Sequence, residues 1–223
     1  MNIYSISIND NVNEENLTCW VEKVSKVKRE KVKKYKFFDD KKRSIYGELI
    51  LRYALVHEMG IKNKKIIIDV DINGKPYLTD NSHVFFNISH SGEYVICAVD
   101  NHPIGVDIEL IGNADVAVAK KVFTLNERRQ IFAKKEYANT LFYQFWTLKE
   151  CYVKYKGMGL GIPFDSFSFV VDDGVIKMES IKEEKVNFLS VMFLEEYCIS
   201  VCTEENCELN YIKQLSIDDL MEM

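Results

Sequence analysis

The chain has 223 residues, of which 47% are hydrophobic and 28% charged, with 13 Phe and 12 Tyr. This composition can bury a core, which excludes a disordered chain, and the 10 Gly and 3 Pro exclude a collagen-like one. No apolar run approaches the roughly 18 residues of a membrane-spanning helix, and residues 1–6 lack the basic and apolar regions of a secretory signal. We therefore expect a globular cytoplasmic protein with no membrane partner, built as one large or two small domains.

The net charge of −5 is unevenly distributed. Residues 23–36 contain eight Lys or Arg and one Glu, so this segment carries +7 and the remainder −12. This balance does not suit a protein that coats nucleic acid, and we expect no nucleic-acid partner. The basic segment is either a solvated helix face or a local anion site. The six Cys include no C-x-x-C pair and no zinc spacing, so reduced thiols are expected.

The first half of the chain predicts helices followed by strands. An apolar stripe at helical spacing predicts two helices, at about 13–27 and at 40–59, the second ended by Gly60. Alternation of apolar and polar residues predicts strands at 3–8, 66–70, 83–88 and 94–99. A turn at 73–76 separates two of these strands.

The second half repeats this pattern. A strand is expected at 104–110, and helical spacing covers 114–135 and 140–156. Four short strands follow, at about 165–171, 174–178, 187–193 and 197–203, and the acidic tail 204–223 is expected to be partly helical. We predict an α+β protein of two similar lobes, residues 1–103 and 104–223, each with antiparallel strands packed on helices.

Asp107 and Glu109 form the first constellation that could carry chemistry. In the expected strand 104–110, positions i and i+2 share one face, so both carboxylates project together while Val106, Ile108 and Leu110 face the core. A hard divalent cation with oxygen ligands would relieve their repulsion. The alternative is a solvent-facing strand edge with scattered acids.

The second group of residues that could carry chemistry lies on the expected helix 140–156. Trp146, Glu150 and Lys154 form a stripe beside its apolar face. Since an indole is a poor choice for open solvent, this side is expected to border a cleft, where Glu150 could complete a three-carboxylate metal site and Lys154 could meet a phosphate. The alternative is an exposed ion pair between Glu150 and Lys154.

Two further sets suit an anion. Residues 86–93 read as a strand that runs into a polar turn with Ser89 and His90, although His90 could equally be a capping or core histidine. Clustered cations attract phosphate monoesters, and the chain offers four candidates: Lys28, Lys31, Arg43 and Lys75.

These pieces occur in one order along the chain: residues 74–76 (GKP), 86–91 (FNISHS), 105–109 (GVDIE) and 146–150 (WTLKE) with Lys154. In this order they resemble the motifs of the Sfp-type 4′-phosphopantetheinyl transferases, and the resemblance spans roughly residues 1–203. It implies a monomer of two similar α+β lobes that holds coenzyme A and Mg²⁺ (Mn²⁺ also suits the donors) in the cleft between them. It also implies the reaction: the 4′-phosphopantetheine arm of coenzyme A moves to a serine hydroxyl of an apo carrier protein, releasing adenosine 3′,5′-bisphosphate.

The resemblance also assigns roles to residues. Asp107, Glu109 and Glu150 would hold the metal ion, Glu150 would be the base for the carrier serine, and Lys154 would contact the pyrophosphate; Asp107, Glu150 and Lys154 are thus the catalytic candidates. The other residues expected to bind coenzyme A are Lys28, Lys31 and Arg43 at the 3′-phosphate, Ser44 as a further phosphate donor, Lys75 and Pro76 at the adenine, and Ser89 and His90 at a phosphate.

Some points depart from the family or stay open. Cys151 follows Glu150 where the family more often has Ala or Ser, and it is either a small buried hydrophobe or an oxidant-sensitive thiol. The carrier would dock near 112–124 if Val122 and Phe123 are exposed; otherwise these two are helix core. Two other functions remain: a metal-dependent nucleotide phosphodiesterase or pyrophosphatase, and a non-enzymatic coenzyme A-binding module.

Overall fold

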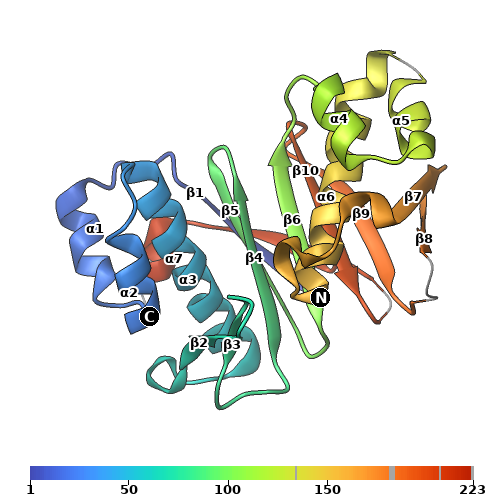
Figure 1. Cartoon of the computed structure of the whole chain (residues 1–223). Helices are drawn as coiled ribbons and strands as arrows, with labels where there is room; N and C mark the ends of the chain where they lie inside the picture. The colour runs from blue at the N-terminus through green and yellow to red at the C-terminus, as the bar shows by residue number, and fades with distance from the viewer. Residues whose placement is uncertain (134, 181–183, 206, 222–223) are drawn as a thin grey trace. The chain divides into compact units, whose positions relative to one another are not determined.

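The computed structural model describes residues 1–133, 135–180, 184–205 and 207–221. It divides into two compact units, Met1–His102 together with the segment from Leu209 onward, and Pro103–Glu208. Both units combine helices with antiparallel strands, which confirms the predicted α+β class (Figure 1). None of the helices in the described residues is long and apolar enough to cross a membrane.

The first unit is a sheet covered by helices. Its helices are α1 (Glu14–Val21), α2 (Lys26–Val32), α3 (Phe38–Met59) and α7 (Ile217–Met221), with a 3₁₀ turn at Asn63–Lys65. Its strands are β1 (Asn2–Ser7), β2 (Ile68–Val70), β3 (Pro76–Leu78), β4 (Phe85–Ser91), β5 (Tyr94–Asp100) and β11 (Tyr211–Leu215). Four of them form a sheet in the order β11-β1-β5-β4, and β2 and β3 form a separate hairpin.

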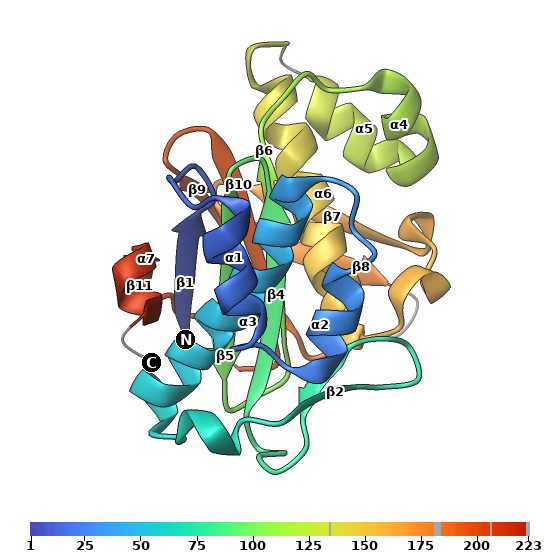
Figure 2. The ribbon, with the colours of Figure 1, turned by 90° about the vertical axis from the view of Figure 1, so that its left-hand side faces the viewer.

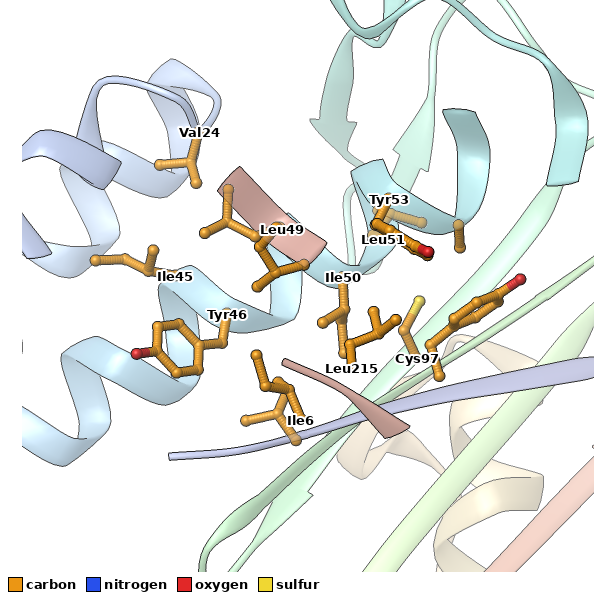
Figure 3. Packing of buried hydrophobic residues seen from close by; sticks show 14 of the residues in the cluster. Ile6, Val24, Ile45, Tyr46, Leu49, Ile50, Leu51, Tyr53, Cys97 and Leu215 are labelled. Atoms are coloured by element: carbon orange, nitrogen blue, oxygen red, sulfur yellow. The ribbon is translucent and has the colours of Figure 1, made fainter. Parts of the chain in front are cut away.

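Helix α3 organises this unit. It packs against β1, β4 and β5, while α1, α2 and α7 pack against α3 itself, and Figure 2 shows α1, α2 and α3 in front of the sheet. Gly60 ends α3 in the left-handed conformation (φ 63°), as the sequence predicted. The core beneath α3 includes Ile6, Leu49, Ile50 and Leu215 (Figure 3).

The predicted helix over 13–27 is wrong in one respect, because the structure divides it into α1 and α2. Ser25 stands between them and caps α2, where its side chain accepts a hydrogen bond from the backbone N–H of Lys28 at 3.3 Å. A serine at an N-cap adopts extended backbone, which interrupts a continuous helix. The partner that holds Ser25 in place lies 23 residues away, on α3.

The C-terminal segment also differs from the prediction, which placed all of 104–223 in the second lobe. Strand β11 pairs in parallel with β1 at the edge of the first unit's sheet, from Asn2 opposite Tyr211 to Ile6 opposite Leu215. Tyr211 donates a hydrogen bond to Glu58 of α3 at 2.7 Å, and Lys213 donates one to Tyr53 at 2.8 Å. Part of the tail is helical, as predicted, in α7; residues 206, 222 and 223 of the predicted tail lie outside the described residues.

The described residues of the second unit form three helices and two sheets. The helices are α4 (Val116–Val122), α5 (Leu125–Phe132) and α6 (Ala138–Lys156), with 3₁₀ turns at Lys135–Tyr137, Gly159–Gly161 and Phe164–Ser166. The strands are β6 (Ile104–Leu110), β7 (Phe167–Asp172), β8 (Val175–Ser180), β9 (Asn187–Phe193) and β10 (Tyr197–Thr203). Strands β6, β10 and β9 form an antiparallel sheet in that order, and β7 and β8 form a hairpin.

The predicted helix over 114–135 is two helices, because Thr124 starts α5 with a capping box to Glu127; residue 134 lies outside the described residues. The predicted strands 187–193 and 197–203 match β9 and β10 residue for residue. Every residue of β10 is buried, whereas most of β9 is half-buried or exposed.

The packing of α6 on β6 is unusually close at Gly105. A Cβ atom on Gly105 would overlap the backbone carbonyl oxygen of Cys151 and the backbone nitrogen of Tyr155. Backbone atoms within a helix cannot move aside as a flexible side chain can. Gly105 therefore sets the distance at which α6 lies on the strand that carries Asp107 and Glu109.

We predict that Gly105→Ala lowers the free energy of unfolding by about 1–3 kcal/mol or more, because overpacking against helix backbone forces α6 away from β6. The matched control is Gly161→Ala, where the nearest neighbour of the added Cβ is the Met158 Cβ at 3.9 Å. Chemical denaturation of both variants measures the difference. Equal stability of the two variants would show that the close approach is not a constraint.

Candidate active site

Asp107 and Glu109 lie on β6 with Gly105, on the face that meets α6. Asp107 is 3% exposed, and Glu109 is half-buried. Val106 and Ile108 are fully buried, as predicted, but Leu110 is 40% exposed, so its expected place in the core is wrong. Leu110 is the last residue of β6, where the strand still pairs with Tyr197 of β10.

Lys154 binds the buried carboxylate. Its ammonium Nζ donates to Asp107 Oδ1 at 2.6 Å, and the two side chains are 27% and 4% exposed. The predicted alternative was an ion pair between Lys154 and Glu150 along the helix; the contact observed instead joins α6 to β6. A charge-assisted hydrogen bond of this kind is among the stronger polar contacts in a protein.

Glu150 shares this electrostatic environment. Burial raises the pKa of its carboxyl group, the negative charge of Asp107 raises it further, and the positive charge of Lys154 lowers it. Asp107, Glu150 and Lys154 are therefore close enough to act on one another, although they come from two elements. The centre therefore combines two carboxyl groups, Asp107 and Glu150, with the ammonium group of Lys154.

The donor chemistry of this centre fits a hard divalent cation, because all candidate ligands are carboxylate oxygens and two of them repel each other. The structure does not assemble them into a preformed site: among the described residues, no group of three or more His, Cys, Asp or Glu side chains could hold a metal ion. Lys154 supplies the positive charge at Asp107 in this arrangement.

Other α6 residues tie the centre to its surroundings. Thr147 Oγ1 lies 2.7 Å from Ser200 Oγ of β10, and Ser200 pairs with Asp107 across the sheet. Trp146 is half-buried and packs on Phe142 and Phe164, with ring centroids 6.4 and 6.1 Å away. Aromatic packing within the second unit therefore explains part of the burial of the Trp146 side chain.

Lys149, in the same motif, was not predicted to matter. Its side chain is fully buried and forms an ion pair with fully buried Glu127 at 3.0 Å. It also donates to the carbonyl oxygens of Phe164 and Phe167 at 2.6 and 2.8 Å. Burial lowers the pKa of Lys149, and Glu127 opposes this shift. The only signal in the sequence was a lysine beside apolar Leu148, which a helical wheel does not distinguish from a surface lysine.

Cys151 is fully buried, and burial raises the pKa of its thiol well above the usual range. Of the two alternatives for Cys151, burial favours a small buried hydrophobic residue over a reactive thiolate. Cys198 and Cys202 are also buried, at 2% and 0% exposure.

In the first unit, Lys28 and Lys31 of α2 lie within electrostatic reach of each other. Burial and the charge of Lys31 lower the pKa of Lys28, while Glu48 raises it. Two cations that repel each other at one place favour an anionic ligand. The structure therefore brings this predicted pair together.

Arg43 and Ser44 lie side by side on α3 and differ in their partners. The Arg43 guanidinium donates to the carbonyl oxygen of Gly92 at 2.8 and 3.1 Å and to Asp40 at 3.0 Å, so it holds the β4–β5 turn. The Ser44 hydroxyl is buried and has no hydrogen-bond partner among the described residues. A buried unpaired hydroxyl is costly, and a ligand oxygen would satisfy it.

The predicted polar turn over 86–93 is shorter in the structure. Ser89 and His90 belong to strand β4, which pairs with β5 as far as Ser91, and only Gly92 and Glu93 form the turn. Ser89 is 5% exposed, whereas His90 is exposed, so His90 is not a core histidine. The two side chains point to opposite faces of the strand.

Lys75 and Pro76 lie on the β2–β3 hairpin. The Asp71 side chain accepts a hydrogen bond from the backbone N–H of Lys75 at 2.8 Å, and Gly74 takes the left-handed conformation (φ 84°) that closes the turn. Pro76 starts β3, a strand that was not predicted. Proline is tolerated at the first position of a strand.

A groove on α4 and α5 combines apolar and basic residues. Its lining consists of Val116, Lys120, Leu125, Arg128, Arg129 and Phe132. Val116 and Leu125 are 53% and 55% exposed, and the three cations form no ion pair within the described chain. Phe123 is 2% exposed and therefore belongs to the core, which was the alternative to an exposed docking residue.

Comparison with known proteins gives matches along most of the chain. A family model described as 4′-phosphopantetheinyl transferase, N-terminal, matches residues 11–102, and the model of the 4′-phosphopantetheinyl transferase superfamily matches residues 103–202. A Bacillus subtilis protein named 4′-phosphopantetheinyl transferase is 34% identical over 201 residues, which cover 89% of this chain and 90% of that protein. The 4′-phosphopantetheinyl transferase Sfp of Bacillus subtilis strain 168 is 30% identical over 224 residues, covering 99% and 100%.

Among solved structures, a holo-(acyl-carrier-protein) synthase from Bacillus anthracis matches with 19% identity and a TM-score of 0.39, covering 45% of this chain and 93% of that one. This structural similarity is too low to establish a shared fold, so the sequence matches decide the family.

Proposed function

Because the chain belongs to the 4′-phosphopantetheinyl transferase superfamily, we propose that it transfers the 4′-phosphopantetheine arm of coenzyme A to a serine hydroxyl of apo carrier proteins. The observation that carries this proposal is the centre at which Lys154 binds buried Asp107 beside Glu150. Such a centre offers a base and a cation for a phosphoryl group, which is what this transfer requires.

The transfer forms a bond between the carrier serine oxygen and the phosphorus that bears the pantetheine arm. The bond from that phosphorus to the bridging oxygen of the pyrophosphate breaks, and adenosine 3′,5′-bisphosphate leaves. Glu150 accepts the serine proton, directly or through a water molecule. Lys154 leaves the Asp107 carboxylate and binds a pyrophosphate oxygen instead, where it stabilises the negative charge that develops as the bond breaks.

We further propose that Asp107, Glu109 and Glu150 hold a magnesium ion, for which Mn²⁺ could substitute because both accept oxygen ligands. When bound, the ion would neutralise charge on the pyrophosphate. The oxygen-only donor set and the mutual repulsion of Asp107 and Glu150 support this assignment.

The first unit supplies residues for the adenosine and 3′-phosphate end of coenzyme A. Lys28 and Lys31 bind the 3′-phosphate, supported by their mutual repulsion, and the buried hydroxyl of Ser44 donates to a phosphate oxygen. Arg43 contributes by fixing the turn at Gly92. Ser89 and His90 contact a phosphate, and Lys75 and Pro76 border the adenine; these four assignments follow the family motifs.

The carrier protein docks on the α4–α5 groove in this proposal. Val116 and Leu125 offer apolar contacts, and Lys120, Arg128 and Arg129 offer charge. Carriers of this family are expected to be acidic around their serine, so the groove is complementary. We also propose that the enzyme acts as a monomer in the cytoplasm.

The experiment that tests the function incubates the protein with Mg²⁺, coenzyme A and an apo carrier, and measures the mass of the carrier. A gain of one phosphopantetheine is the expected result. Hydrolysis of coenzyme A without any change in the carrier would favour the metal-dependent phosphodiesterase or pyrophosphatase, and binding of coenzyme A without reaction would favour a non-enzymatic module.

For the catalytic centre, we predict that Glu150→Gln lowers kcat about 10²–10⁴-fold, the usual contribution of general base catalysis. The amide has nearly the same shape but cannot accept the serine proton. The mass of the carrier, followed over time, measures the rate. Transfer at the wild-type rate would show that Glu150 is not the base.

For the 3′-phosphate, we predict that Lys28→Ala with Lys31→Ala weakens coenzyme A binding at least about tenfold, since one charge-assisted hydrogen bond contributes about 1.5–3 kcal/mol. Affinity for 3′-dephospho-coenzyme A should change much less, because it lacks the group that the lysines bind. Calorimetric titration with both ligands provides the comparison. An equal loss for both ligands would refute the assignment.

For carrier docking, we predict that Lys120→Glu with Arg129→Glu raises the KM for an acidic carrier about tenfold and leaves the KM for coenzyme A unchanged, because reversed charges repel the partner. The wild-type KM for the carrier should also rise with salt more steeply than that of the variant. Lys177→Glu, an exposed lysine on β8, is the matched control. The docking site is elsewhere if the control and the double variant behave alike.

A further inference from the structure

Glu48 is a buried acid that reaches from α3 to the start of α2. It is 2% exposed. Its Oε1 accepts a hydrogen bond from the backbone N–H of Ser25 at 2.5 Å, and its Oε2 accepts one from the Ser25 hydroxyl at 2.8 Å. Both carboxylate oxygens of Glu48 therefore accept hydrogen bonds from Ser25, and Ser25 is the N-cap of α2.

The contact continues through Ser25 into α2. The hydroxyl of Ser25 donates its proton to Glu48 and accepts from the backbone N–H of Lys28 at 3.3 Å, which uses both capacities of a hydroxyl group. A continuous hydrogen-bonded path therefore connects Glu48 to the backbone of Lys28. Arg52, one turn along α3, donates to the same Oε1 of Glu48 at 2.9 Å.

Helix α2 needs this support for two physical reasons. It has only seven residues, too few for an isolated helix to be stable in water. Its first turn contains no acid and begins with Lys26, although the positive end of a helix dipole favours negative charge. Glu48 supplies from α3 the negative charge that the sequence of α2 lacks.

The charge of Glu48 also acts on the lysine side chain. Burial and Lys31 both lower the pKa of Lys28, and Glu48 is the group that raises it. Lys28 is partly buried, so without a nearby carboxylate its ammonium would be harder to keep protonated.

We propose that Glu48 is a positioning residue for phosphate binding: it fixes the first turn of α2 and thereby sets where Lys28 and Lys31 stand. This inference rests on the proposed function, in which these two lysines bind the 3′-phosphate of coenzyme A. Both carboxylate oxygens of Glu48 are engaged by protein groups, so its role in this proposal is to position α2.

The test is the preference of the full-length enzyme for coenzyme A over 3′-dephospho-coenzyme A, taken as the ratio of their dissociation constants. In Glu48→Gln the preference should fall about tenfold, the size of one charge-assisted hydrogen bond, while kcat at saturating coenzyme A changes little. A purely structural role would lower thermal stability and leave the ratio unchanged. Glu30→Gln, an exposed α2 acid that pairs with Lys33, is the matched control and should keep the wild-type ratio.

A rescue variant separates charge from shape. Adding Ser25→Asp to Glu48→Gln returns a negative charge to the N-cap of α2, where it can still accept from Lys28, and should restore most of the preference. If Glu48→Gln does not fold, Ser25→Ala replaces it and should show a smaller fall in the same ratio.

The outcomes distinguish the two levels of the proposal. If the Lys28 and Lys31 double variant loses the preference but Glu48→Gln and Ser25→Ala keep it, the positioning role is wrong and the phosphate assignment stands. If the lysine double variant keeps the preference as well, the phosphate assignment itself fails.

Discussion

The close approach of α6 to β6 at Gly105 is the constraint on which the candidate active site depends. With no side chain at this position, the helix backbone lies directly on the strand. Lys154 of α6 then reaches Asp107 of β6, and Glu150 comes within electrostatic reach of the same carboxylate. A larger residue at 105 would separate two elements that each carry only part of the chemistry.

Buried ion pairs serve as the anchors of both units. In the first unit, Glu48 with Arg52 fixes the start of α2. In the second, Lys149 with Glu127 joins α6 to α5 and to the start of β7. Breaking one partner of such a pair leaves an uncompensated buried charge, which costs about 3–5 kcal/mol. The first of these pairs lies at the start of α2, the helix that carries Lys28 and Lys31.

The sequence predicted the elements whose signal is local. Alternation located β9 and β10, and Gly60 marked the end of α3, because neighbouring residues determine these features. The same holds for Asp107 and Glu150, whose motifs place them on a strand and on a helix. The break at Ser25 was missed because its cause, Glu48, lies on another helix. Strand β11 was missed because it pairs with β1, at the other end of the chain. Lys149 was not singled out because its partner Glu127 comes from α5.

In the proposed function, α6 and β6 together form one anionic centre that receives the pyrophosphate of coenzyme A with a divalent ion. The most direct measurement is the affinity for coenzyme A of the wild type and of Asp107→Asn, each with Mg²⁺ and with excess chelator. We expect Mg²⁺ to tighten coenzyme A binding to the wild type and to have little effect on the folded variant. An equal effect of Mg²⁺ on both proteins would contradict it.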